Sequence, residues 1–368
     1  MKILLIGEYS NVHWTLSEGL KALGHEVCVV SDGDAWKDYK RDINLKREST
    51  GIVDSVRYYM KILRLMPQLK GFDIVQLINP IFFELRAGKL ETFYSQLRRN
   101  NRKVVLGAFG MDYYYVNTCL DCKTFRYSDF NFGKHQRTEE SFNQHFMDEW
   151  LGEKKALNMH IANDCDAIVT GLCEYDMCYR QVFPDKTTFI PFPIKPAPQK
   201  KEVEPFINRP LRIFIGIQKT RSAYKGTDIM LRALERVKEK YPERMEIVKV
   251  ESVPFEQYRQ MMDSSDVIVD QLYSYTPAMN ALQAMSQGLI VVGGAEPENY
   301  RILGEEQLHP IINVKPEEED CFNKIEHLVL HPEQVPQLKR DSIEYINRHH
   351  DYLKVAKRYS DLYTQLLA

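Results

Sequence analysis

Short apolar runs alternate with amphipathic helical repeats along most of this chain, and this alternation restricts the fold more than any other feature. Residues 3–6 form an apolar run that ends at Gly7, and Val12 and Leu16 then begin a repeat with helical spacing. A second apolar run follows at residues 25–30. Units of strand, helix and strand predict a parallel sheet that is covered on both faces.

The same pattern recurs in both halves of the chain. We predict further strands at residues 73–78, 103–106, 167–170, 188–190, 211–215, 245–250, 267–270 and 289–292. Helices are expected at residues 83–99, 149–164, 227–241, 255–262, 277–287 and 342–366. The stretch 109–144 is rich in Tyr, Phe, Asp and Asn without a clean period, so we interpret it as a long functional loop region.

A proline-rich segment divides the two α/β halves. Four prolines fall between residues 191 and 198, and proline removes backbone donors and restricts its neighbours. We therefore predict an N-terminal domain over 1–193, a linker over 194–210, a C-terminal domain over 211–340 and terminal helices over 341–368. Two such sheets suggest a cleft between them, and ligands of open α/β sheets bind at the carboxyl ends of strands.

Composition excludes several classes of protein. The net charge of −2 lacks the basic excess of a general nucleic-acid binder. The apolar run at the start is too short for a secretory signal, and no stretch of about 18 apolar residues would span a membrane. The seven scattered cysteines predict reduced thiols and a cytoplasmic protein. Cys119 and Cys122 form a CxxC without a second pair at fitting spacing, so we expect no metal site.

The most informative stretch is a basic loop at residues 214–227. An apolar strand ends at Gly216, and the loop that follows carries Lys219, Arg221 and Lys225 immediately before a predicted helix. A helix N-terminus offers free N–H groups and a positive dipole end, and arginine binds phosphate in a fork. The pattern indicates a binding site for a diphosphate. The alternative interpretation is a basic loop exposed to solvent.

Two further stretches indicate ligand contacts. In residues 270–288, Thr276 is predicted to cap a helix that starts at Pro277, and Asn280 and Gln283 face either solvent or a ligand. In residues 291–299, a strand runs into a pair of glycines that ends at Gly294, which lets backbone approach a ligand closely. The acids that follow, including Glu298, either accept hydrogen bonds from sugar hydroxyls or are ordinary helix N-terminal acids.

Taken in order, these motifs resemble the C-terminal domain of the retaining glycosyltransferases of the GT-B fold, family four. The resemblance rests on the loop that ends Lys225-Gly226, the helix end Leu-Gln-Ala-Met-Ser-Gln-Gly at 282–288, and the run Val-Val-Gly-Gly at 291–294 with Pro-Glu at 297–298. The opening strands and the segment Phe-Gly-Met-Asp at 109–112 are also similar to that family. The similarity covers nearly the whole chain and is strongest at 211–300.

The resemblance implies an α/β fold of two Rossmann-like domains that face each other across a cleft, with the terminal helices packed back toward the N-terminal domain. It implies transfer of a hexose-type sugar from a nucleotide-diphosphate donor, with retention of configuration, without a metal or cofactor. Arg221 and Lys225 match the family's diphosphate-binding pair, with Lys219 as a rival for the first position. In the family such cations stabilise the leaving group.

The sequence departs from the family at two positions. Tyr275 and Gln283 stand where the family has glutamates that contact the transferred sugar and the ribose, respectively. A glutamine binds a hydroxyl more weakly than a carboxylate does. The departure leaves open a second interpretation, a nucleotide- or sugar-binding protein of the same fold that has lost catalysis. Tyr275, Thr276, Asn280, Gln283, Gly294 and Glu298 are the expected donor-binding set beside Lys219.

The N-terminal half offers the acceptor side in the resembling family. Gly7, Asn11 and His13 follow the first strand and are expected there, although His13 also suits an ordinary helix start. Asp112 is the candidate catalytic base of this half, with a helix cap as the alternative. The loop after Gly7 lacks the second glycine of a dinucleotide fingerprint, which counts against an oxidoreductase.

The expected partners are a nucleotide-diphosphate sugar and a glycan or lipid-linked acceptor, with no nucleic acid. Residues 57–66 form a basic amphipathic stretch. This stretch indicates either peripheral contact with the inner face of a membrane or a surface helix that packs on the sheet.

Overall fold

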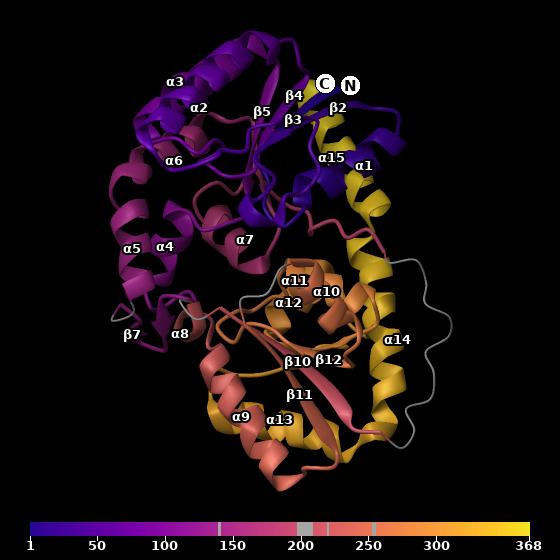
Figure 1. The fold of residues 1–368 in the computed structure, drawn as a ribbon. Coiled ribbons are helices and arrows are strands. Elements are labelled where there is room, and N and C mark those ends of the chain that lie inside the picture. Colours follow the sequence, from indigo (N-terminus) through magenta and orange to yellow (C-terminus); the bar gives the residue numbers. More distant parts are fainter. Residues whose placement is uncertain (139–140, 197–208, 219–220, 252–254) are drawn as a thin grey trace. The chain divides into compact units, whose positions relative to one another are not determined.

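The structure is a computed structural model that describes residues 1–138, 141–196, 209–218, 221–251 and 255–368 (Figure 1). By their contacts the residues form two compact units. Unit 1 contains Met1–Asn117, Met147–Pro193 and Tyr352–Ala368, and unit 2 contains Thr118–Phe146 and Ile194–Asp351. Each unit has its own parallel sheet, so the predicted α/β class with two Rossmann-like domains is confirmed. The segment 118–146, which the sequence placed in the first domain, groups with unit 2.

Unit 1 is built on a parallel sheet that, within the described residues, has seven strands in the order β3-β2-β1-β4-β5-β8-β9. Every side chain of β4 and β8 is buried, as expected for a sheet covered on both faces. The short edge strand β3 was not predicted. The strands are β1 (Lys2–Ile6), β2 (Glu26–Ser31), β3 (Ile43–Asn44), β4 (Ile74–Leu77), β5 (Lys103–Ala108), β8 (Ala167–Thr170) and β9 (Thr187–Phe189).

The helices of unit 1 follow the predicted alternation in part. The helix Cys173–Arg180 was not predicted, Ile52–Leu65 was predicted only as one alternative for the stretch 57–66, and the predicted helices 149–164 and 342–366 are each interrupted. The stretch 109–144, predicted as a loop, contains the helix α4 (Tyr113–Cys119), the hairpin strands β6 (Asn131–Phe132) and β7 (His135–Gln136), and the start of α5 (Ser141–Trp150). The chain passes into unit 2 within α4 and returns within α5. The other helices are α1 (Val12–Ala22), α2 (Ile52–Leu65), α3 (Ala87–Asn100), α6 (Glu153–Asp164), α7 (Cys173–Arg180) and α15 (Tyr352–Leu367).

The C-terminal helix α15 packs beside α1 in unit 1 (Figure 1). The two helices approach so closely at Gly19 that a Cβ there would lie 2.6 Å from the Cβ of Ala356. His25 Nε2 lies 2.8 Å from the hydroxyl of Ser360, and the hydroxyl of Tyr363 donates to Gln76 of β4 at 2.7 Å. The last helix therefore completes the core of unit 1.

Unit 2 has a second parallel sheet, of five strands among the described residues, in the order β11-β10-β12-β13-β14. These strands are β10 (Leu211–Ile217), β11 (Met245–Glu251), β12 (Val267–Val269), β13 (Ile290–Gly293) and β14 (Ile312–Asn313). Its helices are α8 (Ser222–Lys225), α9 (Thr227–Lys240), α10 (Phe255–Asp263), α11 (Met279–Ser286), α12 (Pro297–Leu303), α13 (Glu318–Leu330) and α14 (Val335–Tyr345).

Alternate side chains of β10 pack against the two helical layers of unit 2. Ile213 and Ile215 belong to the apolar cluster beneath α9 and α13, which lie side by side (Figure 1). Phe214 points the other way and meets the ring of Tyr258 in α10 edge-on, with centroids 5.0 Å apart. This period of two confirms a strand with both faces buried.

The same hydrogen bond from a backbone N–H to an aspartate carboxylate recurs at the starts of strands in both sheets. An aspartate stands directly before β3, β4, β8 and β12, and its carboxylate accepts the N–H of a residue in the neighbouring strand. The pairs are Asp42 with Val29, Asp73 with Lys2, Asp166 with Val104, each at 2.8 Å, and Asp266 with Arg212 at 3.0 Å. Polar groups at the amino ends of these strands are thus used for structure.

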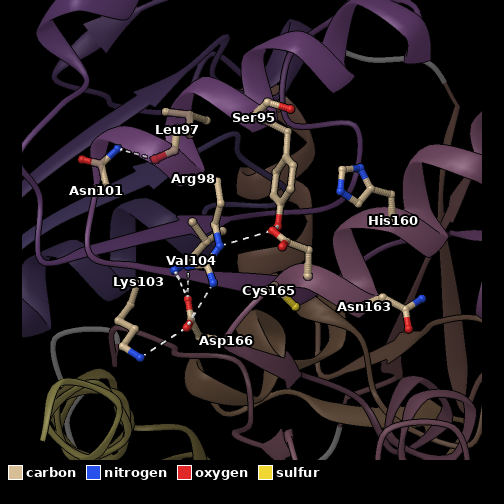
Figure 2. A network of polar contacts seen from close by, with 12 residues as sticks. Ser95, Leu97, Arg98, Asn101, Lys103, Val104, His160, Asn163, Cys165 and Asp166 are labelled. Carbon is tan, nitrogen blue, oxygen red and sulfur yellow. Dashed lines mark hydrogen bonds and ion pairs between the residues drawn. The ribbon is translucent and has the colours of Figure 1, made fainter.

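Figure 2 shows this hydrogen bond at Asp166, where three elements of unit 1 meet. The carboxylate also receives Arg98 Nη1 of α3 at 2.6 Å and Lys103 Nζ of β5 at 3.3 Å. Arg98 reaches Asp164 as well, at 3.2 Å. The network ties α3 to the β5–β8 pair at the amino ends of these strands. Across the described residues, no helix has the length and apolar character needed to cross a bilayer.

Candidate functional site

The carboxyl ends of β10, β12 and β13 bring the predicted donor-binding loops together in unit 2. Leu272 N–H donates to the carbonyl of Lys225 at 2.9 Å, which joins the loop after β10 to the loop after β12. Glu296 N–H donates to the carbonyl of Tyr275 at 2.9 Å, which joins the loop after β12 to the loop after β13. Residues 47 and 21 positions apart in these two bonds thus form one surface, because parallel strands end at the same edge. We call residues 221–226, 270–276 and 293–298 the three loops.

The first loop packs closely against the second loop at Gly226. Gly226 has φ +72°, ends α8 and precedes α9, and a Cβ there would lie 2.7 Å from the Cβ of Leu272. Burial raises the pKa of Asp270, and the positive charge of Lys225 and a hydrogen bond from Asn280 oppose this rise. Lys225 and Asp270 therefore lie close enough to interact. Arg221 directly precedes α8, and the predicted Lys219 lies outside the described residues.

The second and third loops touch at Gly294. A Cβ at this position would lie 1.8 Å from the carbonyl oxygen of Ser274, so only glycine allows the contact. Thr276 is buried, and its carbonyl accepts a hydrogen bond from the hydroxyl of Ser274 at 2.6 Å. The predicted cap at Thr276 is wrong: α11 begins at Met279 after Ala278, because residues 274–276 form a turn of their own.

The two positions that depart from the family pattern are held by contacts within unit 2. Tyr275 is fully buried, and its hydroxyl oxygen accepts the backbone N–H of Arg126 at 2.7 Å. Gln283 is half-buried, and its amide donates to the hydroxyl of Ser286 in the same helix at 3.1 Å. Asn280 is exposed and donates to the hydroxyl of Tyr258 at 3.0 Å.

Arg126 attaches the segment 118–146 to the second and third loops. Its guanidinium donates to Glu298 at 2.6 Å and to Glu296 at 2.7 Å, and lies over the ring of Tyr275 with Cζ 4.6 Å from the centroid. The hydrogen bond from Arg126 lowers the pKa of Glu298. Tyr127 also donates its hydroxyl to Glu296. Glu296 and Glu298, the acids expected to bind sugar hydroxyls, are thus paired with an arginine of the segment 118–146.

Arg137 attaches the same segment to the first loop. Its Nη2 donates to the carbonyl of Ala223 at 2.8 Å, and its Nη1 donates to the carbonyl of Asp129 at 3.0 Å. The guanidinium also lies over the ring of Tyr273, with Cζ 3.4 Å from the centroid. The hydroxyl of Tyr224 donates to Asp129 at 2.7 Å, which adds a second link. The segment therefore contacts all three loops. Sequence reasoning missed both arginines, because neither has a local motif.

The predicted acceptor-side residues lie at the carboxyl end of β1 in unit 1. Gly7 has φ +84°, and a Cβ there would lie 2.2 Å from Cγ2 of Ile78. Asn11, with φ 70°, directly precedes α1, and its amide donates to the hydroxyl of Thr15 at 3.1 Å. The backbone in this loop is left-handed at both positions, which Asn tolerates better than most residues.

His13 is buried and links three elements of unit 1. Its Nδ1 lies 2.8 Å from the carbonyl oxygen of Gly7, which only accepts, so Nδ1 carries the proton. Its Nε2 then accepts from the side-chain amide of Gln76 at 3.1 Å. Burial lowers the pKa of His13 to about 3, so the ring is neutral. Both ring nitrogens are therefore occupied inside the fold.

Glu8 is a functional candidate that the sequence did not single out. It lies at a cavity of about 250 Å³ in unit 1, whose wall includes Tyr9, Asp34, Tyr58 and Phe82. Its carboxyl oxygens accept the N–H groups of His13 at 3.2 Å and Trp14 at 2.9 Å, at the start of α1. Burial raises the pKa of Glu8 to about 8 despite these bonds. The side chain is therefore a buried, largely protonated acid at neutral pH.

Asp112 has the geometry of a helix cap. It is fully buried, and its carboxylate accepts the N–H of Tyr115 at 2.9 Å and the hydroxyl of Tyr179 at 2.7 Å. Burial raises the pKa of Asp112 to about 6. These contacts place it at the start of α4.

Within the part of the chain that the structure describes, the predicted donor-binding residues belong to no metal-binding cluster and do not line the cavity beside the third loop. Among the described residues, no group of His, Cys, Asp and Glu has the arrangement of a metal site. A cavity of about 500 Å³ borders the third loop at Ala295 and Pro297 and continues along Tyr300 and His309, and none of the predicted donor-binding residues lines it.

Comparison with known proteins identifies the fold. No protein-family model and no curated protein matches the sequence. The chain is similar to the solved sucrose-phosphate synthase from Thermosynechococcus elongatus, at 12% identity and a TM-score of 0.61, over 100% of this chain and 99% of that one. It is also similar to HepE from Anabaena in complex with UDP and glucose (11%, TM-score 0.58) and to WaaG, a glycosyltransferase involved in lipopolysaccharide biosynthesis (12%, TM-score 0.58), each over 99% of this chain and 100% of that one.

The chain has the GT-B fold. Likeness at such low identity establishes architecture and leaves function to the residues of the site. The donor, acceptor and stereochemical predictions therefore stay predictions, as do the roles of the individual site residues.

The buried acid predicts a specific pH dependence of stability. The pKa of Glu8 rises from 4.5 to about 8 on folding, so the unfolded state loses its proton first as pH rises. Stability from this group is complete below pH 4.5 and falls until about pH 8. In Glu8→Gln we expect the free energy of unfolding, measured by urea titration, to fall about 5 kcal/mol less over this range. Glu26→Gln, at an exposed position, should follow the wild-type curve; an unchanged slope in Glu8→Gln would contradict the buried acid.

The contacts of Arg137 predict a large cost for its loss. Arg137→Ala removes the donors of several carbonyls and the contact with Tyr273, so we expect the free energy of unfolding of unit 2 to drop by about 2–3 kcal/mol. Arg137→Lys should recover less than half, because one ammonium cannot make the fork and lie flat on the ring. Calorimetry is the measurement. Arg232→Ala, at an exposed position of α9, should cost less than about 1 kcal/mol; a similar small cost for Arg137→Ala would refute the attachment.

Proposed function

We propose that this protein is a glycosyltransferase that takes a sugar from a nucleotide-diphosphate donor held by unit 2. The observation that carries the proposal is the meeting of the three loops at the carboxyl ends of β10, β12 and β13, with Arg221 and Lys225 in the first loop. Two proteins of the same fold support it: HepE was solved in complex with UDP and glucose, and WaaG is a glycosyltransferase.

In the proposed reaction the acceptor hydroxyl forms a bond to the anomeric carbon of a hexose, and the bond from that carbon to the diphosphate oxygen breaks. The diphosphate leaves with the electron pair, and the proton of the acceptor passes to the leaving group or to solvent. Arg221, Lys225 and the N-terminus of α9 stabilise the developing negative charge, with Lys219 as an additional cation. Protein cations fill the role of a metal ion, so we propose a reaction without metal or cofactor and with retention.

Donor hydroxyls are proposed to bind along the rim of the three loops. Gln283 and Asn280 offer amides, and the turn at Thr276 and Gly294 offers backbone. Tyr275 and Glu298 shape this rim through Arg126, because both bond to it. Arg126 thereby orients the carboxylate of Glu298, which was expected from the sequence to contact the donor directly.

The acceptor is proposed to be a glycan or a lipid-linked sugar, bound on unit 1 near Gly7 and Asn11. Asp112 remains the proposed base of the sequence prediction, but its bonds to Tyr115 and Tyr179 favour the capping role. His13 is proposed to support the loop rather than to touch the acceptor, since both of its nitrogens bond inside the fold.

A second candidate is a binding protein of the same fold without catalysis. The burial of Tyr275 beneath the segment favours it, because the family uses a glutamate there to contact the transferred sugar. The two candidates share the donor site and differ only in turnover. Transfer of radiolabelled sugar, or hydrolysis of the donor without acceptor, separates them.

The first test is thermal stability against uridine, guanosine, adenosine and thymidine diphosphates and their sugars. A ligand that binds the native state stabilises it by about 2.7 kcal/mol at one hundred times its Kd. We expect one nucleotide to raise the melting temperature of the wild type and to leave Arg221→Ala, Lys225→Ala unchanged. Arg236→Ala, Lys240→Ala, in the same unit, should keep the wild-type shift. No shift with any nucleotide would refute the donor site.

A further inference from the structure

Helix α2 of unit 1 carries an exposed apolar stripe in addition to its buried one. Tyr58, Ile62 and Leu65 are buried against unit 1. Ile52, Val53 and Val56 are 85%, 64% and 58% exposed, and Met60 and Leu63 are exposed as well. Spacings of three and four residues place Ile52, Val56, Met60 and Leu63 on one line of the helix. Most surface helices have a single apolar stripe facing the core, so this second stripe requires an explanation.

A cationic stripe lies directly beside the exposed apolar one. Arg57, Lys61 and Arg64 are exposed and follow the same spacing of four and three residues, one position after Val56, Met60 and Leu63. Asp54 is the only acidic residue between 52 and 65, and it pairs with Arg57 at 3.2 Å. The helix therefore presents apolar side chains and positive charge together, on the side turned away from the core.

We infer that α2 is a docking surface for an anionic lipid bilayer. The apolar stripe enters the boundary between headgroups and acyl chains, and Arg57, Lys61 and Arg64 bind the lipid phosphates. Such a helix lies in the plane of the interface and does not span it. A second copy of the chain fits this face less well, because a twofold contact through the same stripe would bring the two cationic stripes together.

The inference adds a partner to the proposed function. The proposed acceptor side is in unit 1, the unit that carries α2, so docking would hold unit 1 at the surface where a lipid-linked acceptor resides. This link rests on the proposed function. Lipid binding itself does not, because it involves neither the three loops nor Glu8.

The test is flotation of the full-length protein with vesicles of phosphatidylcholine alone and with 3:7 phosphatidylglycerol to phosphatidylcholine. We expect binding to the anionic vesicles only, and weaker binding at high salt. Arg57→Gln, Lys61→Gln should lower the affinity about 25-fold, at roughly fivefold per cation. Val56→Ser, Met60→Ser should lower it at least about tenfold, because apolar burial is lost.

Matched controls use exposed residues of the same unit that lie outside α2. Val182→Ser and Lys357→Gln should bind vesicles like the wild type, and all variants should keep the wild-type circular dichroism spectrum. Equal binding to both vesicle types, no binding to either, or a dimer in light scattering that Val56→Ser, Met60→Ser dissociates would each overturn the inference. Nucleotide stabilisation measured on the same samples reports the donor site separately, so failure of one proposal is distinguishable from failure of the other.

Discussion

Burial of both faces of each parallel sheet is the constraint from which the rest of the structure follows. Strands such as β4 and β8 are covered on either side, so polar chemistry is confined to the strand ends. Aspartates before four strands use the amino ends for backbone hydrogen bonds, as at Asp166 and Asp266. The carboxyl ends are left for loops, and there the basic loop of unit 2 and the Gly7 loop of unit 1 lie.

The sequence predicted the architecture well, because burying one face of a helix or strand requires apolar residues at a regular spacing. Ala167–Thr170 is a strand with the predicted bounds, and α9 and β10 lie within two residues of theirs. The meeting of the three loops depends on the strand order β10-β12-β13, which the sequence did not predict. The start of α11 was missed at Thr276, because a turn at residues 274–276 displaces the helix to Met279.

The parts that sequence reasoning missed are long-range contacts. The stretch 109–144 has no clean hydrophobic period. The roles of its arginines depend on partners far along the chain, because Arg126 donates to Glu298 and Arg137 donates to the carbonyl of Ala223. The raised pKa of Glu8 likewise depends on a cavity assembled from several elements. Attachment by Arg126 and Arg137 gives unit 2 a preformed shape around the three loops, which favours binding because less ordering is required.

Hydrogen exchange in the presence and absence of a saturating nucleoside diphosphate tests the central claim most directly, because it locates the ligand without assuming turnover. The account predicts slower exchange in residues 221–226, 270–276 and 293–298, and in the attached stretch 125–137, with the strand ends of unit 1 unchanged. Protection confined to residues 300–313 beside the larger cavity, or to residues 7–14 of unit 1, would contradict a donor site on the three loops.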